Sequence, residues 1–307
     1  MKILKVLNGM RKFLFDSNYR FLILSSLGKY DNMDDEQYLK KRYKASFKSE
    51  LDLEAPKTFN EKLQWLKLYD RRPEYTMMVD KYLVREFIAK TIGEEYLIPL
   101  LGVWDNPDEI DFDALPEQFV LKCNHNSGLG MCICTDKSKL NINRVKKELR
   151  KGLKQDYYLS GREWPYLNVP RKIICEQFIS SNDKAPNDYK FFCFNGDVKF
   201  FKIDYDRFTC HRANYYDINK KLLSLSEKSF PTDPQRVPEF PRQLDKMISF
   251  AKILSREIPF VRVDFYEVDG KVYFGELTFF PSSGFETFVP EEWDYVLGEI
   301  LTLPNKL

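Results

Sequence analysis

Three charged residues interrupt two apolar segments near the C-terminal end of the chain. Arg262, Asp264 and Glu276 lie in VRVDFYEVDGKVYFGEL, where most of the neighbours are Val, Phe and Tyr. A charge in an apolar strand is costly unless it is paired or binds a metal ion. Two carboxylates that meet across a hairpin suit Mg²⁺, which takes few protein oxygens, and Arg262 would then face a phosphoryl oxygen. The alternative is an Arg262–Asp264 ion pair beside a surface glutamate.

The register of this hairpin makes the metal hypothesis testable. A two-residue turn at Asp269-Gly270 would pair Asp264 with Gly275 and place Glu276 on the opposite face of the sheet. Joint metal binding by the two carboxylates therefore predicts an odd-length loop or a β-bulge in the hairpin. We expect this irregularity at Gly270.

A lysine at the end of a second apolar segment precedes a loop of small and polar residues. The segment FVLKCNHNSGLGM places Lys122 before Asn126, Ser127 and Gly128. Glycine lets backbone N–H groups approach a phosphate, and lysine adds a fixed positive charge. No Gly-Lys-Ser/Thr follows, so this is not a Walker A motif. His125 in the same loop is either a catalytic base or a structural hydrogen-bonding residue.

Two further strand ends carry charged residues. Glu176 follows the apolar run KIIC, and Asp188 and Lys190 flank Tyr189 at the start of DYKFFCF. One charged residue at a strand end is ordinary. Several such places in this order, together with Lys122 and the hairpin, indicate an active site.

The elements that position these residues change type along the chain. Residues 1–95 are predicted to be helical, with Thr58 and Glu61 in a capping-box pattern. The segment DKYLVREFIAKTIG predicts a second helix that Gly93 ends.

Strands begin to alternate with helices from residue 96. The short apolar runs YLIPLLGVW, EQFVLKCNH and KIICEQFI favour strands, and Asn195-Gly196 favours a type I′ turn inside a long hairpin. Helices are predicted over 136–160 and 240–257. Helices mixed with antiparallel hairpins predict an α+β fold and not a doubly wound sheet.

Composition limits the classes of partner. The 307 residues carry a net charge of +2, which gives no global field for nucleic acid. The six cysteines lack zinc-ligand spacing, so we expect reduced thiols in a cytoplasmic protein.

The first helix has two interpretations. Leu4, Leu7, Met10, Phe13 and Leu14 recur at helical spacing among basic residues, without a signal-peptide pattern. This helix either contacts a membrane peripherally, at its inner face, or packs against its own domain.

The order of these motifs resembles the ATP-grasp superfamily. DKYLVREF looks like its opening helix, which implies that Lys81 contacts ATP phosphates, and LPEQFVLKCNHNSGLGM looks like its central lysine and phosphate-covering loop. IICEQFI looks like the hinge that brackets adenine. The resemblance implies the following ATP-binding residues: Lys81, Lys122, Asn126, Ser127, Gly128, Glu176, Gln177, Phe178, Ile179, Asp188 and Lys190. Asp188 falls where the family places an acid on the ribose. The last hairpin looks like the magnesium site, with Asp264 and Glu276 as ligands and Arg262 and Lys122 as catalytic residues.

PKTFNEKLQWLKLYDR, DKYLVREF, DYKFFCFNG and FGELTFFPSSGF together resemble the TupA-like branch, from about residue 35 to the C-terminus. That branch is associated with teichuronopeptide, capsule and other surface-polysaccharide biosynthesis. Thr278 stands where many ATP-grasp enzymes have Asn, so its metal contact and the number of Mg²⁺ ions stay open. The implied fold has a helical region (1–75), an N-terminal ATP-grasp part (76–118), a phosphate-loop lid (119–178) and a C-terminal subdomain (179–307).

The resemblance implies a carboxylate–amine ligase that uses ATP and Mg²⁺ and works through an acyl phosphate. Its substrates would be a small carboxylate, such as a uronic or amino acid, and an amine, either of them sugar-linked. We assign substrate recognition to Arg207, His211, Arg212 and Ser283, with Tyr205, Tyr215 and Tyr216 near the first three; the alternative for that segment is a solvated loop. The rival functions are a sugar or lipid-linked acceptor kinase, a glycosyltransferase using the Asp204-Tyr205-Asp206 pattern, and an ATP-binding assembly factor.

Overall fold

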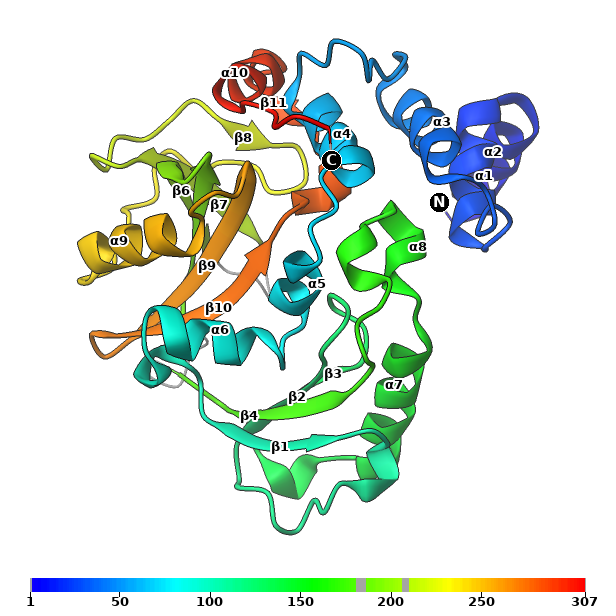
Figure 1. Cartoon of the computed structure of the whole chain (residues 1–307). Helices are drawn as coiled ribbons and strands as arrows, with labels where there is room; N and C mark the ends of the chain where they lie inside the picture. The colour runs from blue at the N-terminus through cyan, green and yellow to red at the C-terminus, as the bar shows by residue number, and fades with distance from the viewer. Residues whose placement is uncertain (1, 181–185, 206–209, 307) are drawn as a thin grey trace.

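The computed structural model describes residues 2–180, 186–205 and 210–306 and shows an α+β fold with two larger antiparallel sheets and a two-stranded one, β11-β8 (Figure 1). A four-stranded sheet has the order β1-β4-β2-β3, and a five-stranded sheet has the order β10-β9-β5-β6-β7. Each sheet has its own apolar core, and the larger core also takes in the helical N-terminal region. The expected fold class is confirmed.

The helical N-terminal region runs up to the first strand. Its helices are α1 (Lys2–Phe15), α2 (Ser17–Ser26), α3 (Asp35–Phe47), α4 (Phe59–Tyr69), α5 (Glu74–Val79), α6 (Val84–Thr91) and the 3₁₀ turn η1 (Glu94–Tyr96). The capping box of α4 is confirmed: the Thr58 hydroxyl accepts the Glu61 N–H at 3.2 Å, and the Glu61 carboxylate accepts the Thr58 N–H at 3.0 Å. The helix that ends before Gly93 is shorter than predicted, because Asp80 first accepts the N–H groups of Tyr82 and Leu83 in a turn.

The small sheet holds the phosphate-loop candidate. Its strands are β1 (Leu100–Trp104), β2 (Phe119–Cys123), β3 (Met131–Cys134) and β4 (Ile173–Gln177). The other elements here are η2 (Pro107–Glu109), η3 (Lys137–Lys139), α7 (Ile142–Lys154), α8 (Tyr157–Gly161) and η4 (Trp164–Tyr166). The helix predicted over 136–160 is thus divided, with α7 packed on β2 and β3. The strand β3 was not predicted.

The large sheet holds the hairpin candidate. Its strands are β5 (Asp188–Phe194), β6 (Asp197–Tyr205), β7 (Arg212–Asp217), β9 (Phe260–Val268) and β10 (Lys271–Thr278). It is flanked by β8 (Ser226–Glu227), α9 (Leu244–Leu254), η5 (Pro281–Gly284), β11 (Phe288–Val289) and α10 (Glu292–Ile300). The Asn195-Gly196 turn is confirmed: Phe194 pairs with Asp197, and both turn residues have positive φ, 49° and 80°.

The two sheets lie side by side, with α5 and α6 beside the junction between them (Figure 1). α9 packs on β5, β6 and β9, while α5 and η1 contact β10. In the described part of the chain, no helix combines the length and apolar character needed to cross a bilayer. This arrangement brings the candidate phosphate loop of the small sheet close to the candidate metal-binding hairpin of the large sheet.

Candidate active site

The β9–β10 hairpin brings Asp264 and Glu276 to paired positions. The turn at Asp269-Gly270 is a regular two-residue turn, with φ of 51° and 80°. The register then shifts between Phe274 and Glu276, so that Glu276 lies opposite Asp264. The predicted irregularity is therefore confirmed as a bulge, but its expected place at Gly270 is wrong.

The bulge lies at Gly275, where the chain comes close to the neighbouring strand. A Cβ atom there would lie 3.0 Å from the Asp264 carbonyl oxygen and 3.2 Å from a ring carbon of Tyr266. Glycine at this position lets two residues of β10 oppose one residue of β9. Glu276 thereby shares a face with Asp264.

Arg262 joins the two carboxylates. Its Nε and Nη2 donate to Asp264 Oδ1 and Oδ2, both at 2.7 Å, and Nη2 also lies 3.1 Å from Glu276 Oε1. Thr278 pairs with Arg262 across the strands, and its hydroxyl lies 3.2 Å from Glu276 Oε1. Burial would raise the Asp264 pKa, but Arg262 and Lys190 hold it below its ordinary value.

These oxygen donors suit Mg²⁺. Two carboxylates and one hydroxyl converge on the same Arg262 nitrogen, Nη2, which fits an ion that binds few protein oxygens and keeps water and phosphate for the rest. Within residues 2–180, 186–205 and 210–306, no group of three His, Cys, Asp or Glu is arranged to enclose a metal ion. The oxygen donors that meet here are the Asp264 and Glu276 carboxylates and the Thr278 hydroxyl.

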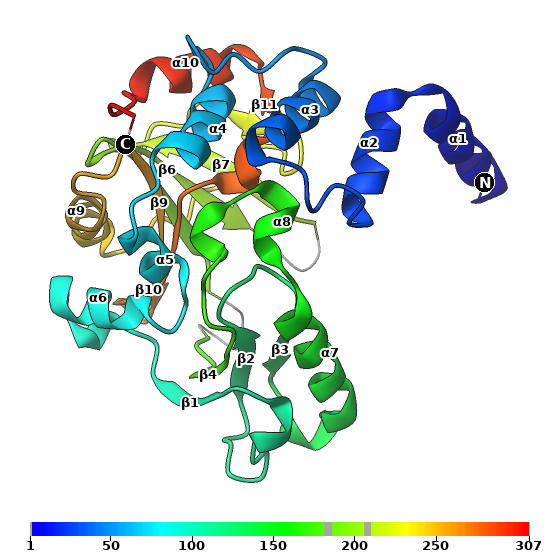
Figure 2. The same cartoon turned by 45° about the vertical axis from the view of Figure 1, so that its right-hand side comes forward.

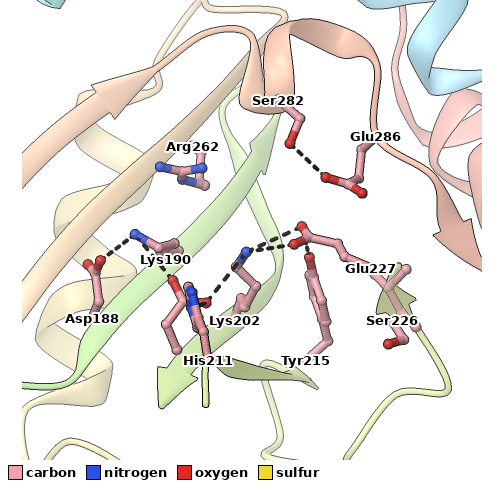
Figure 3. A network of polar contacts seen from close by, with 12 residues as sticks. Asp188, Lys190, Lys202, His211, Tyr215, Ser226, Glu227, Arg262, Ser282 and Glu286 are labelled. Carbon is pink, nitrogen blue, oxygen red and sulfur yellow. Dashed lines mark hydrogen bonds and ion pairs between the residues drawn. The ribbon is translucent and has the colours of Figure 1, made fainter. Parts of the chain in front are cut away.

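A buried polar layer extends from this hairpin across the large sheet (Figure 3). Lys190 pairs in register with Asp264, and its ammonium lies 2.9 Å from Asp264 Oδ2 and 3.5 Å from Asp204 Oδ2. It also donates to Asp188. Burial would lower the Lys190 pKa, but Asp188 and Asp264 raise it. Asp188, the expected ribose ligand, is therefore part of this ion network and is buried.

The layer continues to the small β8–β11 pair (Figure 3). Lys202 lies 3.6 Å from Asp204 Oδ1 and donates to both oxygens of Glu227, at 3.2 and 3.1 Å. The Tyr215 hydroxyl donates to Glu227 as well. Lys202 and Glu227 were not singled out in the sequence, because a lone charge in an aromatic strand gives no local pattern.

The second group of candidates lies where the small sheet meets the hairpin. Lys122 Nζ is 2.6 Å from Glu176 Oε2, and Arg85 Nη1 is 3.4 Å from Glu176 Oε1. These residues and Lys81 line one hollow with Phe274 and Gly275 of the hairpin. Arg85 was missed by the sequence analysis, which singled out only Lys81 in DKYLVREF.

The loop between β2 and β3 has a buried base and an exposed tip. Ser127, Gly128 and Leu129 are exposed, whereas Asn126 is buried and donates to the Gly152 carbonyl. The Asn126 carbonyl accepts a bond from Lys81 Nζ at 2.6 Å. Lys81 is thereby attached to the loop expected to cover phosphates.

His125 is buried in the same loop, and its environment favours the structural alternative. Its Nε2 lies 3.1 Å from the Gln155 carbonyl, and burial lowers the pKa of the ring. The hinge residues begin at the end of β4: Gln177 N donates to the Pro99 carbonyl at 2.9 Å, while Phe178 and Ile179, which follow the strand, are half-buried.

The substrate candidates are divided among three places. Arg207 lies outside the described residues, and so does Asp206 of the Asp-Tyr-Asp pattern. His211 Nε2 is 3.2 Å from Asp204 Oδ1, and Arg212 begins β7 instead of lying in a solvated loop. Tyr205, Tyr215 and Tyr216, which the sequence places near these residues, are all buried.

Ser283 lies in a loop that follows β10 directly. Its hydroxyl donates to Glu163, and its carbonyl accepts a bond from Lys67 at 2.6 Å. Ser282, Ser283 and Gly284 all have positive φ, at 50°, 53° and 65°. Non-glycine residues in this region are strained, so the surrounding contacts must hold the loop in place.

A family model described as TupA-like ATP-grasp matches residues 61–302. Comparison with curated proteins gives no match. Among solved structures, the chain is similar to a D-alanine–D-alanine ligase from Bacillus anthracis, with 16% identity, 66% of this chain and 53% of that chain covered, and a TM-score of 0.39.

The D-alanine–D-alanine ligase from Helicobacter pylori shows 15% identity, with 79% of this chain and 69% of that chain covered and a TM-score of 0.41. For phosphoribosylamine–glycine ligase from Thermotoga maritima, the identity is 13%, the shares are 67% and 48%, and the TM-score is 0.39. This chain thus spans about half the length of two of these three proteins. The identities and scores are low, so the assignment depends on the family match.

Proposed function

Because the chain belongs to the TupA-like ATP-grasp family, we propose that it uses ATP to join a carboxylate to an amine through an acyl phosphate. The carboxylate attacks the γ-phosphate of ATP and releases ADP. The amine then attacks the acyl carbon, phosphate leaves with its bonding electrons, and the amine proton passes to solvent. The product is an amide.

The observation that carries this proposal is the register of the β9–β10 hairpin. The Gly275 bulge puts Asp264 and Glu276 at paired positions, and the same glycine lines the hollow shared with Lys81 and Lys122. Acidic metal-ligand candidates and phosphate-binding candidates thus meet at one place. Phosphoryl transfer depends mainly on such positioning and charge compensation.

The chain's own cations would hold the transferring phosphoryl group. Lys81 and Lys122 come from the helical region and the small sheet, while Arg262 comes from the hairpin. Two hydrogen bonds to Asp264 hold the Arg262 side chain in one orientation. Its remaining N–H groups would therefore bind a phosphoryl oxygen without a further loss of side-chain entropy. Glu176 would turn towards adenine once ATP separates it from Lys122 and Arg85.

Asp264 and Glu276, with the Thr278 hydroxyl as a weaker third donor, are the residues that would hold Mg²⁺. When bound, Mg²⁺ would neutralise phosphate charge during the transfer. Before Mg²⁺ binds, the hydrogen bonds from Arg262 and Lys190 keep the Asp264 carboxylate ionised and oriented.

We propose a uronic or amino acid, free or sugar-linked, as the carboxylate, in capsule, O-antigen or other surface-polysaccharide biosynthesis. The TupA-like membership supports this pathway. His211 borders the polar layer through Asp204, and we propose His211, Arg212, Ser283 and Arg207 as the substrate contacts. The six free thiols and the use of ATP support a cytoplasmic location.

A coupled assay tests the proposed reaction. ADP release is measured with Mg-ATP and a panel of uronic acids, nucleotide-linked uronates and amino acids, each with and without an amine. Ligation predicts ADP release that requires a carboxylate and leads to an amide. ADP release with a hydroxyl substrate alone would instead identify a kinase, and stabilisation by a UDP-sugar but not by ATP would identify a glycosyltransferase.

A further inference from the structure

The N-terminal end of the chain forms a bent arm that stands away from both sheets (Figure 2). α1 packs against α2, and α2 packs against α3. The connection to the body runs through Phe21, whose ring lies 4.8 Å from that of Tyr30 and 5.8 Å from that of Tyr38. The arm is therefore anchored at one end and open along α1.

The bend between the two helices is defined by side-chain caps. The Asp16 carboxylate accepts the N–H groups of Asn18 and Tyr19 at the start of α2. Arg20 donates to the carbonyls of Phe13 and Leu14 at the end of α1, at 3.1 and 2.9 Å. These bonds satisfy both helix ends at the bend, so α1 keeps a defined direction.

Large apolar side chains on this arm face solvent. Met10, Leu14 and Phe15 of α1 are 59%, 64% and 83% exposed, and Leu27 just after α2 is 75% exposed. Met10 and Leu14 are four residues apart and share a helix face. One of the two interpretations of the sequence was that α1 packs against its own domain, but the contact of α1 with α2 leaves these side chains largely exposed. Exposed apolar side chains that gather on one element mark an interaction surface.

The charge of the arm indicates what covers this surface. The first fifteen residues contain Lys2, Lys5, Arg11 and Lys12 and no acidic residue. The first acid, Asp16, is used as a helix cap. A second copy of the arm would bring like charges together, whereas phosphate-bearing lipid headgroups would compensate them.

We propose that the arm docks the protein on an anionic membrane surface. Met10, Leu14 and Phe15 enter the boundary between headgroups and acyl chains, and the exposed Arg11 and Lys12 contact lipid phosphates. The contact is peripheral, and it places the active site beside substrates made or carried at the membrane. It does not depend on which reaction the active site performs.

Co-sedimentation of the 307-residue chain with vesicles tests this inference. Wild type is expected to bind phosphatidylglycerol–phosphatidylethanolamine vesicles and to stay in solution with phosphatidylcholine vesicles. M10Q/L14Q/F15Q should weaken binding at least about tenfold, and R11Q and K12Q about fivefold each. Val237, which is 81% exposed on the body, gives the matched control V237Q, which should bind as wild type does.

The variants change exposed side chains, so their melting temperature and their stabilisation by Mg-ATP should equal those of wild type. Wild type that stays in solution with anionic vesicles, or that binds both vesicles equally, overturns the inference. So does a concentration-dependent dimer that M10Q/L14Q/F15Q abolishes while lipid binding is unchanged, since the surface would then join two copies of the chain. None of these results depends on ligase activity.

Discussion

Asp264 and Glu276 are paired across one hairpin but differ in their surroundings. The Asp264 side chain is 2% exposed and bound to two cations, while the Glu276 side chain is 40% exposed. We therefore expect D264N and E276Q to lower Mg-dependent ATP turnover similarly, by at least about 100-fold. Their unfolding free energies should differ: D264N should lose about 3–5 kcal/mol and E276Q about 0–1 kcal/mol.

Urea unfolding and coupled ADP release measure the two effects separately. V237Q, a change of an exposed side chain outside the candidate site, serves as the control for both. Turnover that persists in E276Q at the wild-type magnesium dependence would remove Glu276 from the metal site.

His125 gives a pH-dependent prediction at the same scale. Burial lowers its folded pKa below the ordinary value of 6.5, so the unfolded chain binds more protons as the pH falls below that value. The unfolding free energy should therefore fall as the pH is lowered from 6.5 through the folded pKa. H125Q should lack this loss and should keep at least about a third of the ATP turnover. V237Q, at an exposed position outside the candidate site, is the control. A turnover loss of 100-fold in H125Q, with unchanged stability, would restore the catalytic-base alternative.

At the scale of elements, patterns with a local cause could be predicted and those with a distant cause could not. The α4 capping box and the Asn195-Gly196 turn depend on neighbouring residues and were foreseen. The bulge was predicted only from the alternation of side chains along the two paired strands. That argument fits a bulge at Gly270 and a bulge at Gly275 equally well. Only the close approach of Asp264 and Tyr266 distinguishes them, and that approach depends on the partner strand. β8 and β11 have two residues each, too few for a periodic signal.

The two glycines of the hairpin should respond differently to substitution. G275V places a side chain against the Asp264 backbone and should cost about 1–3 kcal/mol of stability while reducing ATP turnover. G270N is the matched control: Gly270 has open space around it and a φ of 80°, which Asn tolerates, so the cost should be about 1 kcal/mol or less. Thermal unfolding and ADP release compare the pair. Equal loss in both variants would mean that the bulge has no special role.

A polar face of α4 holds the loop after β10. Asn60, Gln64 and Lys67 are buried at helical spacing and donate to the carbonyls of Glu286, Gly284 and Ser283, respectively. The sequence showed α4 but not this role, because the acceptors lie more than 200 residues away.

Lys67→Met tests the role of this face. The change removes the Lys67 donor from the Gly161 carbonyl and leaves the Ser283 carbonyl only the bond from Gln64 at 3.3 Å, so it should cost about 3–5 kcal/mol. Amide exchange in residues 281–286 should rise, while exchange in β9 stays slow. Lys40→Met, at an exposed position of α3, should change neither. Unchanged exchange in the loop of a folded Lys67→Met protein would show that other contacts hold it.

At the scale of the whole molecule, the active-site candidates come from three separate regions that the fold brings together. Lys81 comes from the helical region, Lys122 and Glu176 from the small sheet, and Asp264 and Glu276 from the large sheet. Their order along the chain indicated the family, whereas the buried polar layer around Lys202 and Glu227 appeared only in three dimensions. The boundaries expected at residues 75, 118 and 178 remain a prediction.

Hydroxylamine trapping is the most direct test of the proposed reaction. Hydroxylamine replaces the amine and converts an acyl phosphate into a hydroxamate that can be measured. With Mg-ATP, hydroxylamine and the panel of uronic and amino acids, wild type should form a hydroxamate together with ADP, and E276Q should form at least about 100-fold less. Ligation would be contradicted if every carboxylate gave ADP without hydroxamate and a hydroxyl substrate became phosphorylated. That result would identify a kinase.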